Sequence, residues 1–146
     1  MAARPAPASR QDFRHFRPIT TRWLDNDVYG HVNNVVYYLW FDTVVNGFLI
    51  ERGLLDPVGG AAIGLVAETG CRYHASVSFP DAIEAGLGLT RLGSSSVEYR
   101  IGIFRHADAT AAAEGRFVHV YVDRQTRRPV PVPEPVRQAL TAELAV

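Results

Sequence analysis

The sequence predicts an α+β fold in which a curved antiparallel β-sheet wraps around one long central α-helix. Two observations predict it. Residues 32–52 contain no proline and place apolar side chains on nearly every face of a helix. Four later segments have the composition of strands and are separated by short turns rich in Gly, Pro, Ser and Asp. Short connections favour antiparallel pairing, and one curved sheet is then enough to cover the helix.

The first expected element is an edge strand within residues 13–23. Its end is β-branched (Ile19, Thr20 and Thr21), and Pro18 is tolerated in a strand only at a free edge.

The long helix is expected over residues 32–52. Asn33 or Asn34 supplies its N-terminal cap, and Gly53 is placed to end it. Because its apolar residues are not confined to one stripe, we expect this helix to be buried almost all round.

Four strands are expected after the helix, at residues 63–73, 83–92, 96–104 and 114–123. Alternation is clearest in the third, where one face carries Val97, Tyr99, Ile101 and Ile103. Three prolines then lead into a short terminal helix that presents Val136 and Leu140.

The composition describes one globular domain. The chain has 146 residues, 47% of them hydrophobic, with 15 basic and 15 acidic side chains and no block of like charge. We therefore expect a disordered tail over residues 1–12, a single domain over 13–146, and neither nucleic acid nor a membrane as partner.

The single cysteine, Cys71, excludes an intrachain disulfide and points to a reducing, cytoplasmic location. It lies within an expected strand and is interpreted as a buried apolar residue. The five histidines lack the spacing of a metal site, so no metal is expected.

The most informative segment is TRWLDNDVYGHVNNVVYY, residues 21–38. Asp25 and Asp27 are two residues apart and point the same way if they end a strand, and Gly30 supplies the turn into the helix. The segment predicts a carboxylate facing a helix N-terminus.

Around this segment the chain resembles the hot-dog-fold acyl-CoA thioesterases of the 4-hydroxybenzoyl-CoA thioesterase type. The resemblance rests on RWLDNDVYGHVNNVVYYLWFD (22–42), TRLGSSSVEYRIGIF (90–104) and FVHVYVDRQTRRPVPVP (117–133), and it covers residues 14–140. It implies hydrolysis of an acyl-CoA thioester to the free acid and CoA, without a cofactor.

The resemblance also implies two catalytic positions. Asp27 would be the carboxylate, acting as nucleophile or as general base, and the peptide N–H of Asn34 would stabilise the oxyanion. An isolated Asp in such a loop is more often a turn or cap residue, and only the motif reverses that interpretation. Asp25 is assigned to structure, with Arg22 as a possible partner.

The remaining substrate-binding residues expected are His31, Asn33, Arg91, Ser95 and Ser96. His31 either orients substrate or water or is a hydrogen-bonded loop residue, and Asn33 is favoured as a cap. Arg91, Arg100, Arg124, Arg127 and Arg128 are candidates for the CoA phosphates, although surface arginines are usually only solvated charges.

A homodimer, or a homotetramer built of dimers, is expected because Tyr37, Tyr38, Trp40 and Phe41 offer more aromatic surface than one sheet readily covers. Two alternatives stay open: a hot-dog module that binds acyl-CoA without turnover, and an acyl-CoA hydratase or dehydratase. The acyl group is also open; the GHVNN form of the motif favours an aliphatic acyl-CoA over 4-hydroxybenzoyl-CoA.

Overall fold

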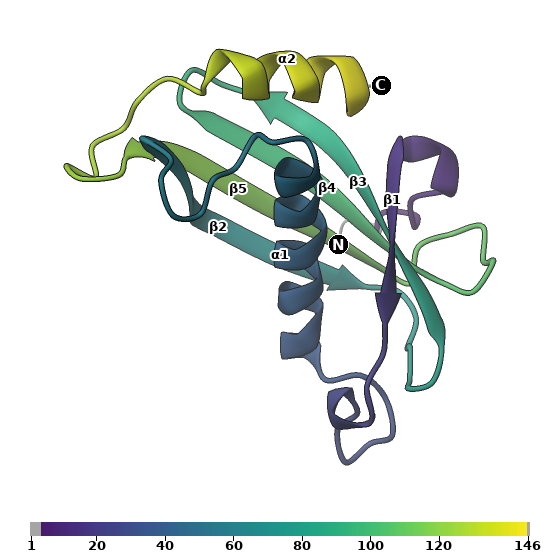
Figure 1. The fold of residues 1–146 in the computed structure, drawn as a ribbon. Coiled ribbons are helices and arrows are strands. Elements are labelled where there is room, and N and C mark those ends of the chain that lie inside the picture. Colours follow the sequence, from purple (N-terminus) through teal and green to yellow (C-terminus); the bar gives the residue numbers. More distant parts are fainter. Residues whose placement is uncertain (1–3, 146) are drawn as a thin grey trace.

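The computed structural model describes residues 4–145 and contains one five-stranded antiparallel sheet, in the order β1-β3-β4-β5-β2. The elements are the 3-10 turns η1 (Arg10–Asp12) and η2 (Trp23–Asp25), the helices α1 (Asn34–Glu51) and α2 (Glu134–Glu143), and the strands β1 (His15–Thr20), β2 (Ala62–Tyr73), β3 (Ala82–Leu92), β4 (Ser96–Arg105) and β5 (Ala113–Asp123). Figure 1 shows α1 against the sheet and α2 across one end of it.

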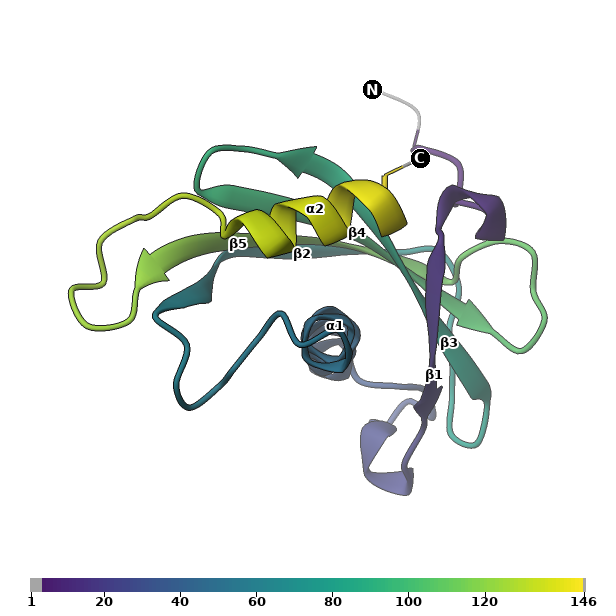
Figure 2. The same cartoon turned by 45° about the horizontal axis from the view of Figure 1, so that its top comes forward.

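The sheet curves around α1, which Figure 2 shows nearly end-on. Strand pairing places the inward side chains of neighbouring strands opposite one another, as in the pair Tyr99 and Phe117. These side chains close over Phe41, Val44 and Phe48, none of which is exposed to solvent. The predicted hot-dog fold is confirmed.

The sequence predicted a helix buried almost all round, whereas one side of α1 is exposed in the structure. The sheet covers one side only, and Val35, Leu39 and Ile50 on the other side are 50–61% exposed. Apolar periodicity cannot tell a face that meets the chain's own sheet from a face that remains open.

The aromatic residues of α1 also lie differently from the expectation. Tyr37, Trp40 and Phe41 are buried within the single chain, and Tyr38 is half-buried. They are therefore not the surplus surface on which the expectation of a dimer rested.

The N-terminal segment assigned to a disordered tail contacts the outer face of the sheet from Ala8 onward; residues 1–3 lie outside the described residues. Phe13 packs on Phe104 and over Gly86 and Gly102, where an added Cβ would lie within 3.0 Å of the Phe13 ring or its Cβ. The segment thus covers one part of the outer face and leaves the rest open.

Candidate active site at the start of the central helix

The loop between β1 and α1 is held by a buried carboxylate. Asp25 is fully buried and accepts hydrogen bonds from the backbone N–H of Arg22 at 2.8 Å and from its Nε at 2.9 Å. The carbonyl of Asp25 in turn accepts the N–H of Asn33 at 2.8 Å. The expected pairing of Asp25 with Arg22 is present, and it links the loop to the residue that precedes the helix.

Asp27 lies at the tip of this loop, in a tight turn closed by Gly30, whose φ of 83° favours glycine. Its Oδ1 accepts the N–H of Tyr29 at 2.9 Å and lies 3.9 Å from Nδ1 of His31. Its Oδ2 accepts no hydrogen bond from residues 4–145. The side chain is 21% exposed, so one carboxylate oxygen is braced and the other is open.

The first turn of α1 is capped from outside the helix. Oδ1 of Asn33 accepts the N–H of Val35 at 3.1 Å, and the Asn33 carbonyl accepts that of Val36 at 3.0 Å. The N–H of Asn34 donates to no acceptor within the described chain. An unpaired N–H at the positive end of an 18-residue helix is suited to stabilise a developing negative charge.

Asp27 and this helix start share one cavity of about 430 Å³, whose walls also include the segment after β2. Tyr73 closes one wall: its ring meets that of Tyr37 edge-on at 5.1 Å, and its hydroxyl donates to the Asn34 carbonyl at 3.4 Å. Burial raises the pKa of Tyr37 to about 12, and burial with a neighbouring thiol also raises the pKa of Tyr73. Both hydroxyls are therefore protonated donors at neutral pH.

The structure brings together four of the expected site residues, because Asp27, His31, Asn33 and Asn34 all line this cavity. Arg91, Ser95 and Ser96 do not line it. Ser95 lies in the β3–β4 turn, where its carbonyl accepts the N–H of Tyr121. Ser96 is the first residue of β4, and Arg91 is exposed on β3.

Sequence reasoning missed the opposite wall, formed by Tyr37 and by the run Tyr73, His74, Ala75 and Ser76. No motif marks this run. The signal available was position: the strand that follows the helix must end near the helix start if it runs antiparallel to the helix.

Cys71 is half-buried on β2, packs against the core and has its pKa raised to about 11 by burial, which makes it a poor nucleophile. Within residues 4–145 no three His, Cys, Asp or Glu side chains gather as metal ligands. In the same part of the chain, no helix has the length and apolar content needed to span a bilayer.

The comparisons with known proteins agree with this fold. The PA5185 protein of Pseudomonas aeruginosa is 53% identical, with 95% of this chain and 97% of that chain covered and a TM-score of 0.92. A putative thioesterase of the same organism is 30% identical over 87% of this chain and 98% of that chain, with a TM-score of 0.81. A Thermus thermophilus thioesterase, solved with coenzyme A and Zn, is 25% identical over 90% and 95% of the two chains, with a TM-score of 0.75.

No protein in the search of curated proteins matches significantly. The family model described as the thioesterase-like superfamily matches residues 21–140, a range that includes the loop of Asp27, all of α1 and four of the five strands. Together with the hot-dog fold and the similar structures, this match shows that the chain belongs to the thioesterase-like superfamily.

Proposed function

We propose that the protein hydrolyses the thioester of an acyl-CoA to the free acid and CoA. The observation that carries the proposal is the shared cavity, which is lined by Asp27, with one oxygen free of hydrogen bonds from the described residues, and by Asn34, whose N–H is unpaired. The coenzyme A bound to the Thermus thermophilus thioesterase supports CoA as the thiol part of the substrate.

The two groups divide the chemistry of hydrolysis. Attack on the thioester carbon places negative charge on its oxygen, which the Asn34 N–H and the helix dipole stabilise. Asp27 either attacks the carbon itself, giving a mixed anhydride that water then cleaves, or takes a proton from the attacking water. In both routes CoA leaves as a thiolate, which is protonated by the Asp27 carboxyl that took the proton from water in the general-base route, or by solvent in the anhydride route.

His31 and Asn33 have supporting roles in this proposal. His31 lies beside the braced oxygen of Asp27 and is placed to orient the carboxylate or the incoming water. Asn33 caps the helix and so fixes the peptide plane whose N–H belongs to Asn34. The hydroxyls of Tyr37 and Tyr73 remain neutral donors on the opposite wall.

The test measures release of free thiol from aliphatic and aromatic acyl-CoAs by the wild type and by Asp27→Asn. We expect a fall in kcat of at least about 100-fold, as for loss of a group that acts in the transition state. Asp42→Asn is the matched control, because Asp42 is exposed on α1 and does not line the cavity.

Each outcome decides between the candidate functions. Turnover that Asp27→Asn leaves intact would remove Asp27 from the mechanism. Binding of acyl-CoA without release of thiol would instead favour the non-catalytic binding module, and addition of water to an enoyl-CoA would favour a hydratase.

We also propose that the protein forms a homodimer or homotetramer, now on different grounds. Large apolar side chains stand exposed on the Asp27 loop, on the open face of α1 and on β2; they include Trp23, Leu24, Val28, Tyr29, Val35, Leu39, Leu65 and Val66. Sedimentation velocity tests this, and a single monomeric species at micromolar concentration would contradict it. A cytoplasmic location stays a prediction.

A further inference from the structure

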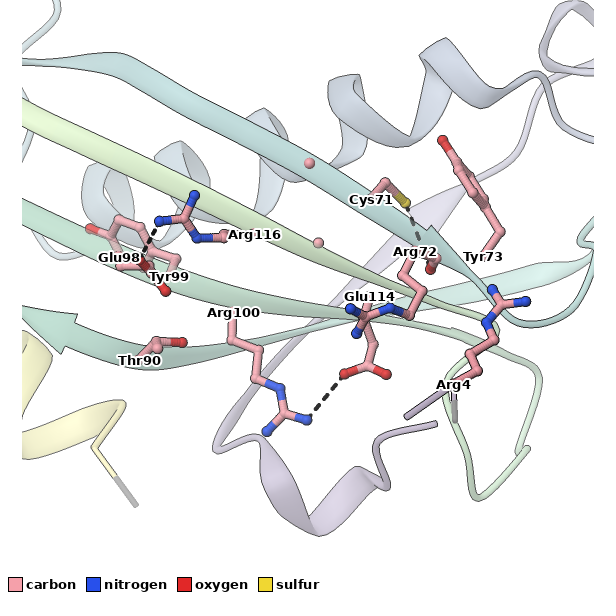
Figure 3. A pocket seen from close by; sticks show the side chains of 12 residues that line it. Arg4, Cys71, Arg72, Tyr73, Thr90, Glu98, Tyr99, Arg100, Glu114 and Arg116 are labelled. Atoms are coloured by element: carbon pink, nitrogen blue, oxygen red, sulfur yellow. Dashed lines mark hydrogen bonds and ion pairs between the residues drawn. The ribbon is translucent and has the colours of Figure 1, made fainter. Parts of the chain in front are cut away.

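A second and larger cavity, of about 590 Å³, lies outside the Asp27 site and is lined mostly by residues of β2, β4 and β5, together with Thr90 of β3 and Arg4 (Figure 3). Four arginines and two glutamates line it, so its walls carry a net charge of +2: Arg4, Arg72, Arg100, Arg116, Glu98 and Glu114. A concave surface with surplus positive charge attracts anions.

The arginines differ in how far they are already neutralised. Arg116 forms ion pairs with both Glu68 and Glu98, and these carboxylates raise its pKa. Arg72 forms no ion pair with any carboxylate of residues 4–145, and neither does Arg4. In Figure 3 no dashed line reaches the guanidinium group of Arg72 or Arg4.

Glu114 cannot neutralise all of the remaining positive charge. It accepts Arg100 at 3.1 Å, His74 at 2.9 Å and the N–H of Ala8 at 3.1 Å. Burial favours its neutral form, but these three hydrogen bonds outweigh burial and lower its pKa, so it is ionised and already engaged. Glu114 thus lies next to two arginines. It already pairs with Arg100, and Arg72, which has no ion pair, stands directly opposite it in the β2–β5 pairing.

The strand register adds an independent argument. Arg100 of β4 and Arg116 of β5 are directly opposite each other on the outer face. Like charges in that arrangement repel each other; Glu68 and Glu98 offset the charge of Arg116, whereas Arg100 shares its one carboxylate, Glu114, with His74. An anion with several oxygens would offset the part of this charge that Glu114 leaves over.

The floor of the cavity is open. Gly70, which faces Arg116 across β2 and β5, has no atom within 4 Å of the position that a Cβ would take. Planar guanidinium groups around an open floor match the oxygens of a phosphate, to which Arg donates in pairs. The volume is in the range of sites that hold a nucleotide-sized ligand.

We propose that this outer-face cavity binds phosphate groups through Arg72 and Arg100, with Arg4 at its rim. Two sources supply that chemistry: the nucleotide end of a CoA thioester, or a free phosphate compound. Tyr73 lines both this cavity and the Asp27 cavity, so a single extended ligand would pass from one to the other at the end of β2. Assignment to CoA rests on the proposed function, whereas the phosphate site itself does not.

Direct binding tests the site without any reaction. Calorimetric titration at low salt with adenosine 3′,5′-bisphosphate and with inorganic phosphate is compared in wild type, Arg72→Gln and Arg14→Gln. We expect Arg72→Gln to weaken binding about tenfold, which corresponds to about 1.4 kcal/mol. Arg14 is exposed and does not line the cavity, so Arg14→Gln controls for the loss of one positive charge.

A second pair of variants keeps the test independent of the loss of an arginine. Gly70→Glu places a negative charge on the open floor, and Gly70→Gln adds nearly the same volume without charge. We expect binding to be weakened at least about tenfold more by Gly70→Glu than by Gly70→Gln. Equal effects in this pair, or affinity that Arg72→Gln leaves unchanged in a folded protein, would overturn the proposal.

The source of the phosphate is decided by comparing an acyl-CoA with the matching acyl-pantetheine. If the site holds CoA, Arg72→Gln raises KM for the acyl-CoA about tenfold, with kcat and the acyl-pantetheine kinetics unchanged. If KM is unchanged while bisphosphate binding is still lost, the site takes a free phosphate compound. Should the protein hydrolyse no thioester at all, the calorimetric comparison still decides whether the site exists.

Discussion

The two faces of the sheet are built from the same strands and have opposite chemistry. On β5 the inward positions carry Phe117, His119 and Tyr121, which are buried against the core, and the outward positions carry Glu114 and Arg116. The inward face is therefore stabilised by packing and desolvation, and the outward face by ion pairs in water. Substitutions of successive residues on one strand should therefore change stability for different reasons: loss of packing on the inward face and loss of ion pairs on the outward face.

Neighbouring truncations on β5 should show the largest difference. Phe117 is 2% exposed within the core, and Phe117→Ala should lower the free energy of unfolding by about 3–5 kcal/mol through lost burial and a cavity. Val118, the next residue, faces outward and is half-buried, so Val118→Ala should cost less than about 1.5 kcal/mol. Urea unfolding of both variants measures this, and similar losses would refute the contrast between the faces.

A pH titration of stability probes the inward face through His119. Burial lowers the pKa of this side chain to about 4, and its Nδ1 has no hydrogen-bond partner in the described residues. Between pH 6.5 and about 4 the unfolded chain therefore binds more protons than the folded one, and stability falls as the pH falls. The loss should approach about 3 kcal/mol.

The matched variant is His119→Phe, which keeps an aromatic ring beside Phe117 and Tyr99. Its unfolding free energy should decline less steeply over the same pH interval, because only the wild type carries the buried imidazole. Parallel profiles for the two proteins would show that His119 does not stay neutral in the fold.

Two glycines on adjoining strands sharpen the comparison further. A Cβ at Gly115 would lie 2.5 Å from Cζ of Phe41, so Gly115→Ala should destabilise by about 1–3 kcal/mol through overpacking. A Cβ at Gly70 meets nothing within 4 Å, so Gly70→Ala should be neutral or should stabilise by up to about 1 kcal/mol. Thermal unfolding of the pair should give shifts of different size, and of opposite sign if Gly70→Ala stabilises; an equal loss in both would contradict the assigned faces.

The smallest effect is expected on the outward face, from Arg116→Ala. Arg116 is exposed and its pairs with Glu68 and Glu98 are screened by salt. The variant should shift the urea midpoint least of those above, and the shift should vanish in 1 M NaCl, where the Debye length is about 3 Å. A shift that persists at that salt concentration would mean that Arg116 contributes packing rather than charge.

Much of the fold could be predicted from local patterns. The expected helix began two residues early, because Asn33 acts as the cap from outside α1 and Val32 instead bonds to Val77. The bounds of the four strands after the helix agree to within one residue, since Gly, Pro and Ser turns mark them clearly, whereas β1 is shorter than the expected range of 13–23.

The candidate site was only half predictable. Asp27 and Asn34 are close in the chain and belong to one motif, whereas Tyr73 reaches the same cavity from the far end of β2. The outer-face arginines show the same limit. Alternation places Arg72 and Arg100 on one face, but only the register of distant strands places both beside Glu114. Long-range pairing carries no local signal.

The two outer strands of the sheet have different consequences for assembly. β1 contains Pro18, which has no N–H to donate to an incoming strand, whereas β2 runs for 12 residues without proline and exposes Leu65 and Val66. A sheet that can grow from both sides adds copies without limit and forms fibres. If the proposed dimer forms by pairing of β2 with β2 of a second copy, that contact uses the edge without proline in both chains, and the remaining edges, at β1, each carry Pro18.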